Sequence, residues 1–196
     1  IFGNPVAHSK SPQMQNAGLS HINFDGNYEK HHLEDGNSIK KVFLENGYTG
    51  ANITVPHKEF AFANADEIRG LAKEIEAVNT YILEDGKVVA YNTDAPGFLK
   101  AIESFGEVKN VLLLGAGGTA KAISLALQEK CIKVTVLNRS EGKLEFFKKH
   151  NIPSYSWENF KLENYDLVVN STSAGLKDEY LPCNKEILEP ILKNAS

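Results

Sequence analysis

The first half of the chain alternates between strand-like and helix-like hydrophobic patterns. The segment 1–6 predicts the end of a buried strand, 27–33 a second strand, and 52–55 a third, in which polar and apolar residues alternate. Ser11 as N-cap and Pro12 as first helical residue predict a helix over 13–21. Apolar residues at helical spacing predict another over 38–45. The order strand, helix, strand, helix, strand is typical of a mainly parallel sheet covered by helices.

Pro56 ends the third strand, because proline cannot donate to a sheet ladder and is well tolerated in the first turn of a helix. We expect one or two helices from there to about Glu76. Their apolar stripe consists of Ile68, Leu71, Ala72 and Ile75.

A hairpin follows, because 77–83 and 87–92 flank a turn that ends in Gly86. Antiparallel pairing brings Asn79 close to Asn92-Thr93-Asp94. Asp94 also stands where a helix begins, with Phe98, Leu99 and Ile102 as its buried face. A helix N-cap would explain Asp94 without any chemistry, so both interpretations stay open.

The second half is patterned as a buried parallel sheet. An apolar strand at 110–114 runs into a glycine-rich turn at 115–122, which opens a helix to about Glu129. Further buried strands are expected at 133–137 and 166–170. A doubly wound nucleotide domain has about six strands and only about three are visible here, so we expect a C-terminal truncation.

These patterns predict an α/β protein with two domains. Residues 1–95 would form a mainly parallel α/β domain. Residues 96–196 would form a Rossmann-like domain, incomplete at its C-terminus.

Composition argues against polyanionic partners. The 196 residues are 42% hydrophobic and 23% charged, with a net charge of −4, which argues against nucleic acid or a membrane surface as the main partner. No apolar run approaches the roughly 20 residues of a membrane span, and there is no signal peptide, although the chain lacks an initiator Met. Cys131, expected as a small apolar residue in a turn, and Cys183 follow no zinc or disulfide spacing. We therefore expect a reduced, cytoplasmic protein without a metal.

Two segments of the first half carry candidate binding groups. Asn52, Thr54 and Lys58 lie on a strand-to-helix corner and could bind a small oxygen-rich molecule, although most lysines are solvated surface residues. Ser9 and Ser11 precede a helix, where hydroxyls and free N–H groups can bind a carboxylate. A plain N-cap would account for Ser11 but leaves Ser9 unexplained.

The second half carries a candidate cofactor site. A glycine-rich turn between a strand and a helix lets the main chain approach a pyrophosphate, and here it comprises Gly115, Ala116, Gly117, Gly118, Thr119 and Ala120.

After the next strand, where NAD-binding proteins usually have an acid, the chain has Asn138, Arg139 and Ser140, with Lys143 beyond. A guanidinium can bind a 2′-phosphate that a carboxylate would repel, so this pattern favours NADP over NAD. A solvated surface arginine would not explain the missing acid. Thr172 belongs to a small polar loop at the carboxyl end of the strand 166–170, where ligands of α/β sheets bind.

The order and spacing of these motifs resemble those of shikimate dehydrogenases over essentially the whole chain. The motifs are Ser9-Lys10-Ser11-Pro12, 52–59, 77–80, 92–94, 115–120, 138–140 and 170–175. Members of that family reduce 3-dehydroshikimate to shikimate with NADPH in aromatic amino-acid biosynthesis, using two α/β domains that face each other across a cleft.

The resemblance implies that the domain of residues 1–95 binds substrate and carries the catalytic residues, and that the domain of residues 96–196 binds NADP. It also implies a role for each motif. Ser9 and Ser11 match the serines that bind the substrate carboxylate; Lys58 and Asp94 match the catalytic pair. The residues that match groups lining the substrate hydroxyls are Asn52, Thr54, Asn79 and Asp94.

The chain departs from the family pattern in places. Ala95 and Glu76 stand where the family commonly has glycine. We expect this sequence to lack the family's C-terminal part, which carries a substrate-contacting glutamine and a helix that packs on the first domain.

Two alternatives stay open. A quinate/shikimate dehydrogenase would also accept NAD, which Arg139 and Ser140 disfavour. A non-catalytic dinucleotide-binding regulator would have no need of both Lys58 and Asp94. The sequence is compatible with either a monomer or a homodimer.

Overall fold

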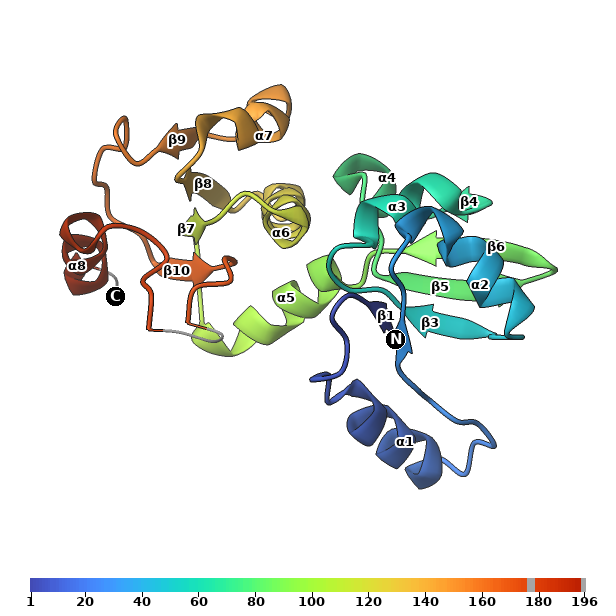
Figure 1. The fold of residues 1–196 in the computed structure, drawn as a ribbon. Coiled ribbons are helices and arrows are strands. Elements are labelled where there is room, and N and C mark those ends of the chain that lie inside the picture. The colour runs from blue at the N-terminus through green and yellow to red at the C-terminus, as the bar shows by residue number, and fades with distance from the viewer. Residues whose placement is uncertain (176–178, 195–196) are drawn as a thin grey trace. The chain divides into compact units, whose positions relative to one another are not determined.

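A computed structural model describes residues 1–175 and 179–194. The chain divides into two compact units, 1–93 and 94–196. Each unit combines helices with strands (Figure 1). The sheet of the second unit is parallel, whereas the central sheet of the first unit is mixed, because a hairpin supplies two of its strands. The predicted α/β class with a Rossmann-like second half is confirmed.

The first unit begins with two short parallel strands. β1 (Phe2–Gly3) pairs with β2 (His31–His32), and Phe2 forms a further parallel bridge to Ile53. The predicted strand over 27–33 is therefore shorter than expected. The reason is local: the N–H and C=O of Tyr28 bond to the side chain of Asn16 instead of a neighbouring strand.

A four-stranded sheet forms the centre of the first unit, in the order β3-β5-β6-β4. The strands are β3 (Gly50–Asn52), β4 (Glu67–Ile68), β5 (Thr80–Glu84) and β6 (Lys87–Tyr91). The hairpin β5–β6 is antiparallel as predicted, β3 joins β5 antiparallel, and β4 joins β6 in parallel.

Ile68 was wrongly assigned to a helical stripe. Glu67 and Ile68 are extended, pair with Val89 and Ala90 and form β4. The helix that follows starts only at Ala72. Ile68 happens to lie at helical spacing from Leu71, Ala72 and Ile75. For so short a strand, the hydrophobic pattern alone does not distinguish a strand from the start of a helix.

The helices of the first unit differ in how much they bury. They are α1 (Ser11–His21), α2 (Ile39–Glu45) after a 3₁₀ turn at Gly36–Ser38, α3 (Lys58–Asn64) and α4 (Ala72–Ile75). Ile39 and Phe43 from α2 and Ala61 from α3 pack on Tyr81 of the sheet, whose hydroxyl donates to the Ala61 carbonyl at 2.5 Å. None of the residues of α1, all of them described, is buried, and Figure 1 shows this helix extending away from the sheet.

The second unit has a fully parallel sheet in the order β10-β7-β8-β9. The strands are β7 (Asn110–Leu114), β8 (Lys133–Asn138), β9 (Ser154–Ser156) and β10 (Leu167–Asn170). β9 was not predicted, because its three residues Ser-Tyr-Ser give no hydrophobic signal at the edge of the sheet.

Helices cover both faces of this sheet. They are α5 (Asp94–Ile102), α6 (Gly118–Glu129), α7 (Glu145–Lys149) and α8 (Lys185–Asn194), with 3₁₀ turns at Glu103–Phe105 and Glu141–Lys143. Figure 1 shows α6 and α8 on opposite sides of β7. Leu112 and Leu114 belong to the core that Leu188 and Ile191 of α8 complete, as expected where strand residues alternate between faces.

The two cysteines lie in different environments. Cys131 lies in the turn between α6 and β8, as expected, and there it is exposed and has a left-handed φ of 57°. Cys183 is buried beside α8, and both thiols are free. Among the described residues, no helix is both long and apolar enough to cross a bilayer.

Candidate active site

The loop after β1 brings two serine hydroxyls together. The hydroxyl of Ser9 accepts the main-chain N–H of Ser11 at 3.2 Å and lies 3.1 Å from the Ser11 hydroxyl. Ser11 is already helical and Lys10 occupies the N-cap position without a side-chain cap, so Ser11 is not the cap expected from the sequence. Both hydroxyls are half-buried, side by side at the start of α1. The arrangement suits a carboxylate, which accepts hydrogen bonds through two oxygens.

Main-chain hydrogen bonds fix the segment that carries Asn52, Thr54 and Lys58. Thr54 donates its N–H to the Phe2 carbonyl at 2.9 Å, and the carbonyl of Lys58 accepts the N–H of Val78 at 3.1 Å. α3 begins at Lys58, two residues later than the position expected for a helix with Pro56 in its first turn. Lys58 is therefore the first residue of α3, and its carbonyl is hydrogen-bonded to Val78, the residue before Asn79.

Gly3 permits the close approach of β1 to Thr54. A Cβ on Gly3 would lie 2.6 Å from the Thr54 methyl group, far inside contact distance. The N–H of Ile53 donates to the Asn79 carbonyl at 2.7 Å. The structure thus places Asn52, Thr54, Lys58 and Asn79 in neighbouring segments of the first unit.

The ends of the hairpin meet as the sequence predicts. Asn79, 8% exposed, donates its amide to the Thr93 hydroxyl at 3.0 Å and accepts the Thr93 N–H at 2.9 Å. Asn92 donates its amide to the Ala77 carbonyl at 3.1 Å. Asp94 follows directly as the first residue of α5, at the start of the second unit.

Tyr28 is a neighbour of this group that the sequence did not reveal. Its hydroxyl donates to Oδ1 of Asn52 at 2.6 Å. Burial raises the pKa of Tyr28 to about 12, so the phenol stays protonated and acts as a donor at neutral pH. An isolated tyrosine in a polar stretch gives no signal of a partner this far along the chain.

The glycine-rich turn of the second unit has the geometry that a dinucleotide needs. Gly115 has a φ of 108° and donates its N–H to the Leu137 carbonyl at 2.8 Å. A Cβ there would lie 2.9 Å from the side chains of Ser171 and Thr172, so only glycine fits. Gly117, the N-cap of α6, is exposed with open space around its Cα. The open N-terminus of α6 fits a pyrophosphate.

The remaining residues of the turn differ in how far they are buried. Ala116 and Ala120 are buried, whereas Gly118 and Thr119 are half-buried at the start of α6. The turn therefore combines a packed side with an accessible one.

The end of β8 lies beside this turn, because Leu137 accepts the Gly115 N–H. Asn138 donates its amide to the Ser140 carbonyl at 2.8 Å, which shapes the loop. Arg139, Ser140 and Lys143 are exposed. Arg139 and Lys143 supply two cations and Ser140 a hydroxyl, and the last residue of β8 is Asn138 and not an acid. This combination suits the binding of a 2′-phosphate.

Thr172 is engaged within its own loop. Its N–H and hydroxyl both donate to Oδ1 of Asn170, at 2.9 and 2.7 Å, and its hydroxyl accepts the N–H of Ala174 at 3.1 Å. The side chain therefore shapes the loop against Gly115, and any cofactor contact would use the loop's accessible edge.

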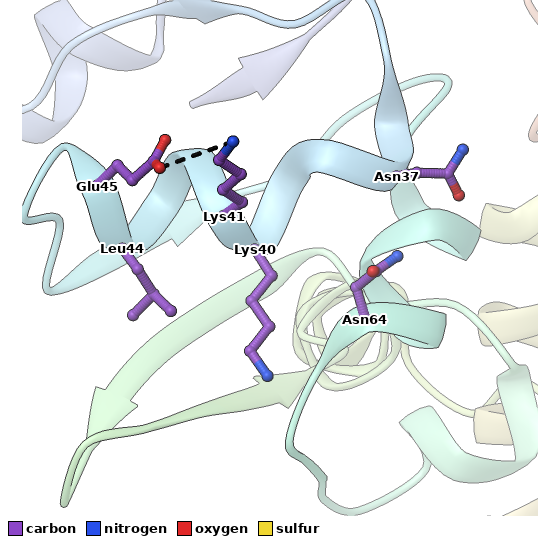
Figure 2. A pocket seen from close by; sticks show the side chains of 6 residues that line it. All are labelled: Asn37, Lys40, Lys41, Leu44, Glu45 and Asn64. Atoms are coloured by element: carbon purple, nitrogen blue, oxygen red, sulfur yellow. Dashed lines mark ion pairs between the residues drawn. The ribbon is translucent and has the colours of Figure 1, made fainter.

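A surface pocket on α2 is separate from these groups. Figure 2 shows its lining, which consists of Asn37, Lys40, Lys41, Leu44, Glu45 and Asn64. Lys41 pairs with Glu45 at 3.8 Å, and Lys40 pairs with Asp66. Its cations are already neutralised, and the pocket contains none of the predicted site residues.

Comparison with known proteins identifies both halves of the chain. Residues 1–81 match the family model described as the shikimate dehydrogenase substrate binding domain, and residues 100–183 match the model described as shikimate / quinate 5-dehydrogenase. A protein of Helicobacter hepaticus named shikimate dehydrogenase (NADP(+)) is 44% identical over 193 residues, covering 97% of this chain and 72% of that protein. Its counterpart in Bacillus cereus is 36% identical, covering 90% of this chain and 69% of that protein.

Solved structures agree with the sequence matches. The shikimate dehydrogenase of Aquifex aeolicus superposes with a TM-score of 0.82 at 35% identity, covering 95% of this chain and 73% of that chain. The Thermus thermophilus enzyme, solved in complex with NADP(H) and shikimate, gives a TM-score of 0.79 at 35% identity, covering 89% of this chain and 68% of that chain. On its sequence and its fold, this chain belongs to the shikimate dehydrogenase family.

Proposed function

We propose that this protein catalyses the reversible, NADP-dependent reduction of 3-dehydroshikimate to shikimate. The observation that carries the proposal is the grouping of Asn52, Thr54, Lys58 and Asn79 in the first unit of a chain whose relatives are named NADP-dependent shikimate dehydrogenases. This places the reaction in aromatic amino-acid biosynthesis. The first unit supplies the substrate site and the second the NADP site.

The polar groups proposed as substrate ligands match the chemistry of the substrate. Ser9 and Ser11 present adjacent hydroxyls to the ring carboxylate. The side chains proposed to bind the ring hydroxyls are Asn52, Thr54, Asn79 and Asp94. Amide and hydroxyl groups both donate and accept, as recognition of several alcohols requires.

Lys58 is the proposed proton donor. When bound, NADPH supplies the hydride that reduces the ring ketone. Negative charge then develops on the ketone oxygen, and the Lys58 ammonium stabilises that charge and delivers the proton that completes the alcohol. Asp94 is the proposed carboxylate of the pair, which orients the lysine or the substrate hydroxyl.

The proposed cofactor contacts come from the second unit. The turn 115–120 and the start of α6 would hold the pyrophosphate, with the loop of Thr172 against Gly115. Asn138 shapes the loop in which Arg139, Ser140 and Lys143 would bind the 2′-phosphate.

The proposal extends to location and assembly. We place the protein in the cytoplasm, where a reducing environment keeps an exposed thiol such as Cys131 free. Either a monomer or a homodimer is compatible with the proposal, and light scattering of the purified protein distinguishes them.

A spectrophotometric assay tests the function. The protein is incubated with shikimate or quinate and either NADP or NAD, and the absorbance of the reduced cofactor is followed. We expect turnover of shikimate with NADP. The kcat/KM for NADP should exceed that for NAD at least about 10-fold, because one charge-assisted hydrogen bond to the 2′-phosphate contributes that much binding free energy. An absence of turnover of shikimate with either cofactor would overturn the proposal.

A further inference from the structure

Tyr28 joins two parts of the proposed substrate site. Its hydroxyl donates to Oδ1 of Asn52 at 2.6 Å. Its main chain is held by Asn16 on α1: the Tyr28 N–H donates to Oδ1 of Asn16 at 2.7 Å, and the Asn16 amide donates to the Tyr28 carbonyl at 2.9 Å. A chain of hydrogen bonds thus runs from α1 through Tyr28 to Asn52.

This connection matters because α1 is otherwise weakly held. The helix has no buried residue over its described length, Ser11–His21, so apolar packing contributes little to its position. The two bonds between Asn16 and Tyr28 are part-buried, and Lys30 adds an exposed bond to the Ala7 carbonyl before the helix. Tyr28 therefore relates the helix that begins at Ser11 to the strand end that carries Asn52.

The bond to Tyr28 also decides which end of the Asn52 amide faces a ligand. A protonated phenol donates to the amide oxygen, so the Asn52 NH₂ group is the end left to face other partners. An amide that could flip would present a donor and an acceptor alternately. The phenol of Tyr28 selects the donor.

We propose that Tyr28 is a positioning residue that holds the Asn52 amide with its NH₂ group directed at a substrate hydroxyl. The inference rests on the proposed function, since it requires a hydroxylated substrate at Asn52. Tyr28 itself touches no substrate and acts through Asn52. A purely structural tyrosine would stabilise the fold without changing recognition of the substrate.

A double-mutant cycle separates these roles. Tyr28→Phe removes the donor but keeps the ring and the main-chain bonds to Asn16. It is compared with Asn52→Ala, with the double variant, and with Tyr48→Phe. Tyr48 is a matched control, because it is a half-buried tyrosine of the same unit whose hydroxyl bonds to Glu29 and His31 and not to a proposed site residue.

The readouts are KM and kcat with shikimate and NADP, the Kd for shikimate by titration calorimetry well below every melting temperature, and Tm. We expect Tyr28→Phe to raise KM and Kd for shikimate about 10-fold, as for one lost hydrogen bond, with kcat within about 2-fold of the parent. In the Asn52→Ala background, Tyr28→Phe should have no further effect. Tyr48→Phe should leave KM and Kd unchanged.

Each other outcome has a defined meaning. If the parent binds and turns over shikimate and the two substitutions act additively, or Tyr28→Phe leaves KM and Kd unchanged, the positioning role is overturned and the proposed function stands. If the parent neither binds nor turns over shikimate, the proposed function fails and the role of Tyr28 fails with it.

Discussion

Asn79 holds the main chain of Thr93 by accepting its N–H at Oδ1, at 2.9 Å, while its amide donates to the Thr93 hydroxyl at 3.0 Å. The two residues flank the hairpin at its open end, Asn79 just before β5 and Thr93 just after β6, and Asp94 follows Thr93 directly. The backbone that leads into Asp94 is therefore fixed by a side chain that is itself a proposed substrate ligand.

Replacing this asparagine should affect both stability and substrate binding. Asn79→Ala leaves the Thr93 N–H without its partner, so we expect a loss of about 1–3 kcal/mol in the free energy of unfolding and a higher KM for shikimate. Urea denaturation and steady-state kinetics measure the two effects. Asn37→Ala, at an exposed asparagine, should change stability by less than about 0.5 kcal/mol. Equal effects of the two substitutions would contradict this view of Asn79.

Glu76 has a left-handed backbone, with φ 57° and ψ 28°, at the C-cap of α4. A side chain in this conformation costs about 1 kcal/mol relative to glycine, so Glu76→Gly should raise Tm by about 2–4 °C in a chain of this size. Glu74→Gly, inside the same helix, should lower Tm instead, because glycine destabilises helix interiors. Differential scanning calorimetry compares them, and a lower Tm for Glu76→Gly would contradict the prediction.

Arg139 should set the preference for NADP. Loss of its guanidinium removes charge-assisted hydrogen bonds to the 2′-phosphate, so Arg139→Ala should raise KM for NADP about 10- to 100-fold and leave that for NAD nearly unchanged. Lys133→Ala is the control, since Lys133 is exposed at the opposite end of β8. Equal changes with both cofactors would show that Arg139 does not bind the 2′-phosphate.

Asp166 should make stability depend on pH in the acid range. Hydrogen bonds from the N–H groups of Lys109 and Asn110, at 2.8 and 2.9 Å, lower the pKa of this carboxyl below its usual 3.8. The folded pKa lies below the unfolded one, so the stabilisation is fully present above the unfolded value and is lost as pH falls through the folded pKa.

Asp166→Asn keeps an acceptor oxygen but cannot ionise. The difference in Tm between the parent and this variant should be largest near neutral pH and should shrink as the pH falls below about 4. Thermal melts from neutral to acid pH measure it. A constant difference over this range would contradict the assignment.

The sequence predicted the fold best where a hydrophobic pattern is long or where a turn requires a positive φ angle. The buried strand at Asn110–Leu114, the turn at Gly115 and the hairpin around Gly86 form as predicted, because continuous apolar runs and positive φ angles leave few alternatives. Short edge strands such as β4 and β9 have too few residues to show a period.

The site was only partly predictable for a related reason. Spacing along the hairpin was enough to bring Asn79 close to Thr93. No local pattern relates Tyr28 to Asn52, because their hydrogen bond joins positions 24 residues apart through tertiary structure. Ser9 was unexplained for a different reason: the pattern pointed to an N-cap at Ser11, whereas in the structure the Ser9 hydroxyl accepts the Ser11 N–H.

Lys58 offers the most direct test of the account, because its ammonium is the proposed proton donor for the ketone oxygen. The measurement is kcat for shikimate with NADP in the parent, in Lys58→Ala and in Lys41→Ala, the last a control at an exposed lysine paired with Glu45. We predict that Lys58→Ala lowers kcat about 10²- to 10⁴-fold with a much smaller change in KM, whereas Lys41→Ala matches the parent. An unchanged kcat in Lys58→Ala would contradict the proposed chemistry.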